Sequence, residues 1–159
     1  MRKLVSVKTF SSNSLNEWHK IRNPFKVVFN FIVIFLSKFS PFLSLKRFLL
    51  RLTGMKIGKN VSIAPGVSFD FFWPELIELK ENCLIGYNTT VLAHEFLIKE
   101  YRTGKVVIGK NVLIGANATV LAGVEIGDDS VIGAMSLVNS DVPNKTFFAG
   151  VPAKFVKKI

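Results

Sequence analysis

A chain of 159 residues has the length of one ordinary domain, which excludes an enzyme with separate cofactor and substrate lobes. Apolar residues make up 49% of the chain and charged residues 20%, which excludes a disordered or acidic solvating protein. The net charge of +10 lies entirely in residues 1–56, where eleven Lys and Arg accompany a single acid, Glu17. Because these basic residues are mixed with Phe, Ile and Leu, they favour a membrane surface as partner, and we expect no nucleic acid.

No periodicity marks residues 1–23, and we make no prediction for them. Pro24 then opens an apolar stretch with helical spacing that Pro41 ends, and Leu45–Leu52 reads as a basic amphipathic helix. Residues 1–53 are therefore expected to form a basic, hydrophobic, helical N-terminal segment. The apolar positions with helical spacing are Phe25, Val28, Phe29, Ile32, Phe35, Leu36 and Phe39.

Two roles remain open for residues 24–52. The apolar face can enter the boundary of an anionic membrane while Lys26, Lys38, Lys46, Arg47 and Arg51 meet acidic lipids. Alternatively, the segment packs over the end of the following domain and shields its first strands from edge pairing. The apolar stretch is too short to span a bilayer, which takes ~20 residues, and it lacks the features of a signal peptide. We expect a cytoplasmic protein, which in the first of these two roles associates peripherally with the inner face of the cell membrane.

From Ile57 onward the hydrophobic period changes to six residues, which helical spacing cannot produce. Gly often follows the repeated aliphatic residue, and a small or β-branched residue stands four places after it. This pattern predicts an all-β fold, a parallel β-helix of about four coils over residues 54–143. In each repeat the aliphatic residue would point into the core, the residue four places later would fill the corner, and Gly would stand in the turn. The evenly spaced strands of a β-sandwich are the weaker alternative. The repeated aliphatic residues are Ile57, Ile63, Leu79, Ile85, Val91, Ile108, Ile114, Val120, Ile126, Ile132 and Val138.

Two stretches interrupt the repeat, one around residues 70–74 and one at residues 95–105. The only cysteine, Cys83, falls on a corner position, so we interpret it as a core residue and not as a nucleophile. A single cysteine also excludes an internal disulfide and a multi-cysteine zinc site, and it indicates a reducing compartment.

The repeat at residues 108–138, followed by Asp141-Val142-Pro143 and by Ala-Gly-Val-Pro-Ala-Lys at 149–154, resembles the hexapeptide-repeat acetyltransferases. Within that family it is most similar to the galactoside, maltose and polysaccharide O-acetyltransferases. The resemblance covers residues 54–157 and implies a left-handed β-helix, a homotrimer with active sites between subunits, acetyl-CoA as acyl donor, and no metal. It also implies that residues 144–159 close the donor site.

His94 stands where the repeat gives way to the second interruption, and it matches the catalytic His of that family. An imidazole can take the proton that a sugar hydroxyl loses as it attacks a thioester. Glu95 is a candidate to hold the tautomer of His94, with a solvated loop acid as the alternative. On the acceptor side, Asp70 and the neighbouring aromatic residue Trp73 are candidates to bind a sugar, with a purely structural hydrophobic edge as the alternative.

The donor site expected from the resemblance lies along the last coils. Ala116 and Ala134 match positions whose backbones pair with the pantetheine amides, and Lys154 matches a residue near the nucleotide phosphates. Asn139 and Ser140 also belong to the expected site, although the family commonly has Thr-Lys there.

The predicted activity is transfer of an acetyl group to a hydroxyl of a sugar or glycan precursor. N-acylation of an amino sugar or amino acid and a non-catalytic β-helix scaffold are the alternatives. The zinc-dependent carbonic anhydrases of this fold need three His, and this chain has two, His19 and His94.

Overall fold

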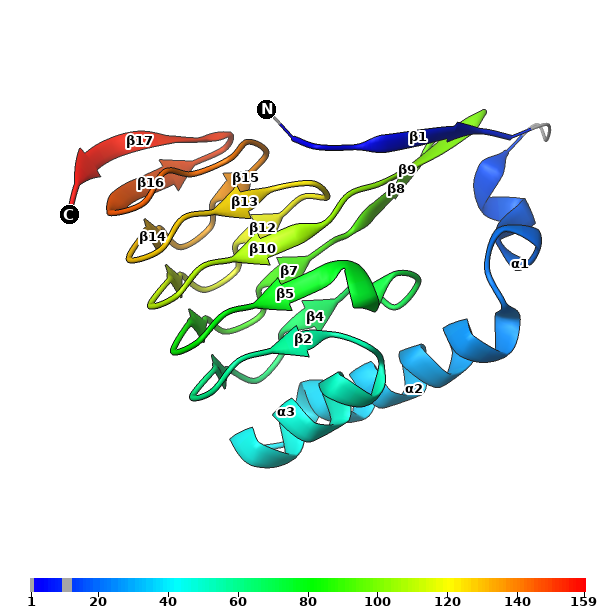
Figure 1. Cartoon of the computed structure of the whole chain (residues 1–159), viewed down its shortest axis with the longest axis horizontal. Coiled ribbons are helices and arrows are strands. Elements are labelled where there is room, and N and C mark those ends of the chain that lie inside the picture. Colours follow the sequence, from blue (N-terminus) through cyan, green and yellow to red (C-terminus); the bar gives the residue numbers. More distant parts are fainter. Residues whose placement is uncertain (1, 10–12) are drawn as a thin grey trace.

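In the computed structural model, which describes residues 2–9 and 13–159, short parallel strands stack into a three-sided β-helix (Figure 1). Over residues 56–138, each of four successive coils gives one strand to each of three sheets. The first sheet contains β2 (Lys56–Ile57), β5 (Ile77–Leu79), β10 (Val106–Ile108) and β13 (Glu125–Ile126). The second sheet contains β3 (Ser62–Ile63), β6 (Leu84–Ile85), β11 (Leu113–Ile114) and β14 (Val131–Ile132). The third sheet contains β4 (Ser68–Phe69), β7 (Thr90–Val91), β12 (Thr119–Val120) and β15 (Leu137–Val138).

The core is a stack of the six-residue aliphatic positions. Ile108 pairs in register with Leu79 on one side and with Ile126 on the other, and all three side chains are buried. The corner positions four residues later are also buried, including Val112 and Cys83. The predicted inward and corner positions of the hexad are therefore confirmed.

Glycine has a different role in the turns from the one predicted. The residue with positive φ is usually an asparagine, such as Asn117 at 57°, and not the glycine that follows the aliphatic residue. Asparagine tolerates this left-handed backbone better than most residues. Gly115 is needed because the next coil lies so close: a Cβ there would stand 2.4 Å from the backbone nitrogen of Ala134.

Two helices cover the first coil, α2 (Pro24–Phe39) and α3 (Leu43–Leu52), at the end opposite the C-terminus (Figure 1). The carbonyl groups of the first coil that point away from the second coil have no neighbouring coil to donate hydrogen bonds to them. Basic side chains of α3 supply the missing donors: Lys46 Nζ donates to Ala64 O at 3.0 Å, Arg47 to Val61 O at 3.0 Å, and Arg51 to Ile57 O at 2.8 Å.

This arrangement corrects the expectation that the basic residues of the segment face lipid. Lys46 is fully buried, and Lys38 donates to Ser68 Oγ at 2.9 Å. Four of the five basic side chains therefore contact the first coil, and only Lys26 is half exposed, beside Glu75. The apolar positions with helical spacing from Phe25 to Phe39 face outward and are about half exposed or more. No helix in the described part of the chain is long and apolar enough to cross a membrane.

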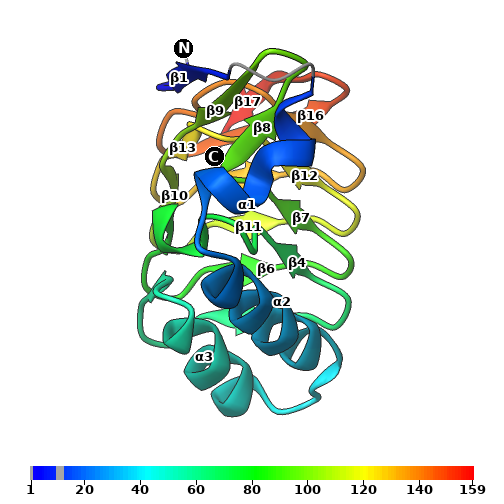
Figure 2. The same cartoon turned by 90° about the vertical axis from the view of Figure 1, so that its right-hand side faces the viewer.

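Residues 2–9 and 13–23, the described part of the N-terminal segment that lacks a periodic pattern, lie beside the second interruption of the repeat. That interruption is a hairpin of β8 (His94–Phe96) and β9 (Glu100–Thr103), and β1 (Val5–Lys8) pairs antiparallel with β9. The chain then passes through the short helices η1 (Ser14–Glu17) and α1 (Trp18–Ile21) in front of this hairpin and down to α2 (Figure 2). The first interruption contains the short helix η2 (Pro74–Leu76).

The C-terminal tail adds two strands at the far end of the β-helix. β16 (Thr146–Gly150) pairs parallel with β14, and β17 (Ala153–Lys158) pairs antiparallel with β16 (Figure 1). The second sheet therefore continues from the body of the β-helix into the tail.

Candidate active site

His94 is the first residue of β8, at the point where the chain leaves the third sheet. Its side chain is 15% exposed, so one part of the ring is accessible and the rest is enclosed. The Nδ1 atom of the ring contacts the Oδ2 atom of Asp70.

Asp70 comes directly after β4, one coil below His94, and its side chain is fully buried. The backbone N–H of Asp70 bonds to Val91 O at 2.9 Å, which fixes it beside the residues that lead to His94. Oδ1 accepts from the N–H groups of Phe72 at 2.8 Å and Trp73 at 3.0 Å, and Oδ2 accepts from the N–H of Ala93 at 2.8 Å. The carboxylate is therefore held from three backbone positions as well as by the imidazole.

The surroundings keep Asp70 ionised. Burial alone would raise the pKa of this carboxyl, but the hydrogen bond and charge of His94, with the N–H groups of Trp73 and Ala93, bring the pKa below its usual value. A carboxylate only accepts hydrogen bonds, so the Nδ1 atom of neutral His94 carries the proton. The Nε2 atom is then a free base, which is the tautomer that proton abstraction needs.

This geometry corrects two expectations from the sequence. Glu95 does not hold His94: its carboxylate forms an ion pair with Arg2 of the N-terminal segment. Asp70 is not available to sugar hydroxyls either, because its oxygens are buried and already accept hydrogen bonds. The structure thus places Asp70 in the position that was expected for Glu95.

Aromatic rings enclose the imidazole. The ring centroids of Phe72 and Trp73 lie 5.0 Å from that of His94, and the centroid of Phe96 lies 4.9 Å away. Trp73 is buried and stacks on Tyr101 at 5.6 Å, and the guanidinium of Arg22 lies 5.2 Å from its ring centroid. Since both neighbours cover Trp73, its indole is part of the wall that positions His94 and not an open platform for a sugar ring.

A cavity of about 240 Å³ opens beside His94, between α2 and the outer side of the third sheet. Asp70 and His94 lie among its lining residues, with Lys38, Ser68 and Thr90 as the other polar groups. The rest of the lining is apolar: Phe31, Ile34, Phe35, Phe69, Phe71 and Leu92.

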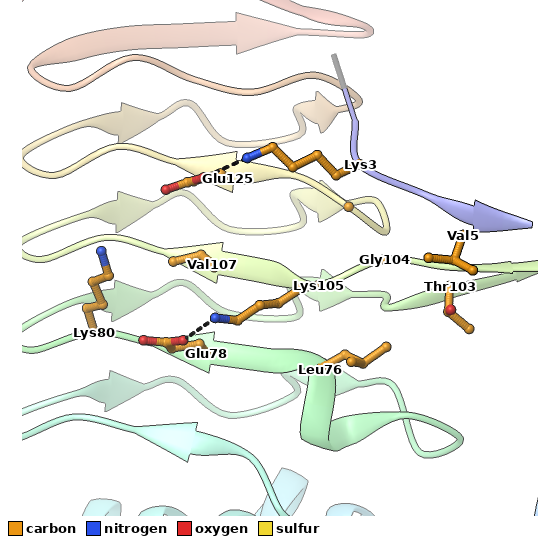
Figure 3. Close-up of a pocket in the computed structure, with 11 residues that line it drawn as sticks. Lys3, Val5, Leu76, Glu78, Lys80, Thr103, Gly104, Lys105, Val107 and Glu125 are labelled. Atoms are coloured by element: carbon orange, nitrogen blue, oxygen red, sulfur yellow. Dashed lines mark ion pairs between the residues drawn. The ribbon is translucent and has the colours of Figure 1, made fainter.

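A larger cavity of about 630 Å³ lies over the first sheet (Figure 3). Its charged side chains largely neutralise each other, because Lys105 bonds to Glu78 at 2.7 Å and Lys3 lies 3.7 Å from Glu125. The hydrogen bond from Lys105 also lowers the pKa of Glu78. This cavity contains none of the residues expected to carry chemistry, so we do not take it as the reaction site.

The residues expected at the donor site are divided between two corners of the β-helix. Ala116 and Ala134 stand on neighbouring coils between the second and third sheets, and Met135 N–H donates to Ala116 O at 2.9 Å. Asn139 follows β15 and is exposed, Ser140 is half-buried beside it, and Lys154 is exposed on β17. His94 and the pair Asn139 and Ser140 lie beyond the same ends of the third-sheet strands, two coils apart, because Val91, Val120 and Val138 pair in register. The alanine column lies beyond the opposite ends of these strands, so a single chain does not bring Ala116 and Ala134 together with the imidazole.

Cys83 has no access to the reaction site. It is buried in the core, and burial raises the pKa of its thiol to about 12. Among the described residues, no group of three His, Cys, Asp or Glu side chains is arranged to hold a metal ion.

Comparison with known proteins gives concordant matches. Residues 105–140 match the family described as "Bacterial transferase hexapeptide (six repeats)". The chain is 48% identical over 159 residues to "Putative acetyltransferase YvoF" of Bacillus subtilis (strain 168), which covers 98% of this chain and 91% of that protein. It is also 36% identical over 104 residues to the galactoside O-acetyltransferase of Escherichia coli (strain K12), covering 65% of this chain and 43% of that enzyme.

Among solved structures, the hexapeptide-repeat-containing acetyltransferase VCA0836 of Vibrio cholerae, complexed with acetyl coenzyme A, matches with a TM-score of 0.70 and 21% identity. The match covers 84% of this chain and 86% of that one, and it shows that the two chains share one fold.

Proposed function

The chain belongs to the hexapeptide-repeat acyltransferases, whose fold is the left-handed parallel β-helix, and from this premise we propose that it is an O-acetyltransferase. It would move an acetyl group from acetyl-CoA to a hydroxyl of a sugar or of a cell-surface glycan precursor. The observation that carries this proposal is the contact between the buried Asp70 carboxylate and Nδ1 of His94, at the wall of a cavity.

His94 acts as the general base in this proposal. A sugar hydroxyl has a pKa far above neutrality, so it must lose its proton as its oxygen attacks the thioester carbonyl. Nε2 of His94 takes that proton, and the ionised Asp70 stabilises the resulting imidazolium. When the carbon–sulfur bond breaks, the imidazolium returns the proton to the departing thiolate.

The acetyl group passes directly from thioester to hydroxyl. An acyl-enzyme route would need a nucleophile near His94, and the one cysteine is in the core with its thiol held protonated. The burial of Cys83 therefore supports a single transfer step with donor and acceptor bound together.

We propose that the donor binds between subunits of a homotrimer. His94 and the column of Ala116 and Ala134 lie at different corners of one β-helix, so the imidazole of one subunit would face the alanine column of its neighbour. The backbone groups of these alanines would pair with the pantetheine amides. Asn139 and Ser140, which follow the third sheet two coils from Leu92 and Ala93, would contribute to the donor site from the side of His94. Lys154, exposed on β17, would contact the nucleotide phosphates.

We further propose that the enzyme is a peripheral protein of the inner face of the cell membrane. The contact would be made by the outward apolar side of α2 and α3 and not by the basic residues of the segment, because Lys46, Arg47 and Arg51 cap the first coil.

The test of the proposed activity is an acceptor screen. Purified protein is given acetyl-CoA with a panel of sugars and amino sugars, and free CoA is followed with time. We expect release that depends on a sugar hydroxyl, with a product ester that mild base cleaves. A base-stable amide as the sole product would identify N-acylation instead, and no release with any acceptor would contradict the proposal.

A further inference from the structure

The outer side of α2 and α3 is an apolar surface without acidic groups. Residues 24–52 contain five basic residues and no Asp or Glu. We call the outward apolar side chains of these helices the helical apolar face. Its members, each at least 41% exposed, are Phe25, Val28, Phe29, Phe31, Ile32, Phe35, Leu36, Phe39, Phe42, Leu43, Leu45, Phe48 and Leu52.

This face is continuous with the cavity beside His94. Phe31 and Phe35 belong to both, since they are about half exposed on α2 and also line the cavity. Phe31 packs edge-on against Phe71 with ring centroids 5.5 Å apart, and Phe71 lines the same cavity. An apolar path therefore runs from the surface of α2 to the imidazole.

The basic residues of α2 and α3 indicate which kind of partner covers the helical apolar face. Lys38, Lys46, Arg47 and Arg51 bond to a hydroxyl or to neutral carbonyl groups, and Lys26 lies 3.9 Å from Glu75, so most of the positive charge has no carboxylate partner. A second copy placed on this face would bring like charges together. An anionic bilayer complements the net positive charge of the segment at longer range, while the apolar side chains of α2 and α3 make the contact with lipid, as in a helix that lies in the membrane interface without spanning it.

We propose, building on the acetyltransferase function above, that the acceptor is a membrane-held amphiphile: a hydroxylated head group on a lipid or long alkyl chain. The helical apolar face enters the lipid boundary. The apolar portion of the acceptor nearest the head group lies in the cavity between α2 and the third sheet, and it thereby brings the hydroxyl to His94.

Flotation with vesicles tests the membrane contact on the full chain. Wild-type protein should float with vesicles of phosphatidylcholine and phosphatidylglycerol, and Ile32→Ser with Leu36→Ser should lose most of that binding. Val156→Ser with Ile159→Ser is the matched control, since Val156 and Ile159 are 52% and 59% exposed against 51% and 57% for Ile32 and Leu36. The membrane assignment would be overturned if wild-type protein did not float, or if both variants lost vesicle binding equally. A changed oligomeric state in the α2 variant alone would also overturn it.

Chain length of the acceptor tests the cavity. Methyl and octyl glycosides of the same sugars are compared as acceptors below the micelle concentration. The octyl compounds should have kcat/KM at least about tenfold higher, which corresponds to burial of roughly two methylene groups. Phe35→Ser at the cavity mouth should reduce this preference. Equal kcat/KM for the two compounds, or an unchanged preference in Phe35→Ser, would overturn the assignment of the cavity.

The two proposals fail in different ways. Transfer to soluble glycosides without flotation or chain-length preference would leave the acetyltransferase function intact and remove the amphiphile. Flotation without acetyl transfer to any acceptor would remove the acetyltransferase function and leave only the membrane contact.

Discussion

The carboxylate of Asp70 contacts Nδ1 of His94 across 24 positions of sequence, because the two residues leave the third sheet on adjacent coils. Replacing Asp70 with Asn keeps an oxygen for the N–H groups of Phe72 and Trp73 but removes the charge that fixes the tautomer. We expect Asp70→Asn to lower kcat by ~10² to 10⁴ with little change in the KM for acetyl-CoA.

Glu95→Gln is the matched control for this variant, since Glu95 is next to His94 in sequence but pairs with Arg2. Its kcat should stay within a factor of about three of wild type. A larger loss for Glu95→Gln than for Asp70→Asn would restore Glu95 as the positioning residue.

Cys83 should be inert in the folded protein. Its thiol is buried with a pKa of about 12, so alkylation by iodoacetamide at neutral pH should proceed only after unfolding. Cys83→Ala should keep most of the activity and lose a modest amount of stability from the core. Recovery of acetylated Cys83 from the working enzyme would contradict direct transfer.

The basic cap of the first coil should contribute to stability. Lys46→Met keeps the apolar stem but leaves Ala64 O without its donor, and an unsatisfied buried carbonyl costs about 1–3 kcal/mol. The free energy of unfolding in urea should fall by that amount. Lys26→Met, at a half-exposed position beside Glu75, is the control and should change little. Equal stability of the two variants would show that α3 does not depend on this bond.

Much of the β-helix could be predicted from the sequence, because its period reports directly on burial. Each coil buries the same two hexad positions, as at Ile114 and Ala118, so no long-range information is needed to place them. The side of α2 that packs on the β-helix could not be predicted in this way. Its buried residues include Asn30, whose Nδ2 donates to Phe71 O at 3.0 Å, while the more apolar side faces outward.

The candidate site was predicted in part. The sequence predicts His94 as a base, and the structure places it at a cavity, but the partner that the sequence suggests is the adjacent Glu95, because a neighbour on the next coil is 24 positions away in the chain. Phe69 pairs with Val91 in register, so aligning these two coils places Asp70 beside the residues before His94. No pattern in the sequence indicates the roles of Arg2 and Arg22, because these roles depend on how the N-terminal segment folds back over the hairpin.

Lys154 tests the proposed donor site. A contact with a nucleotide phosphate is the same in the ground state and the transition state, so Lys154→Ala should raise the KM for acetyl-CoA more than it lowers kcat. Lys145→Ala, another exposed lysine of the C-terminal region, is the comparison. An unchanged KM in Lys154→Ala would exclude this lysine from the donor site.

The most direct measurement of the central claim is the turnover of His94→Ala with the best acceptor from the screen, together with its affinity for acetyl-CoA. Loss of the general base should lower turnover by ~10² to 10⁴, while oligomeric state and acetyl-CoA affinity stay as in wild type. Turnover within a factor of about three of wild type would show that His94 is not the base.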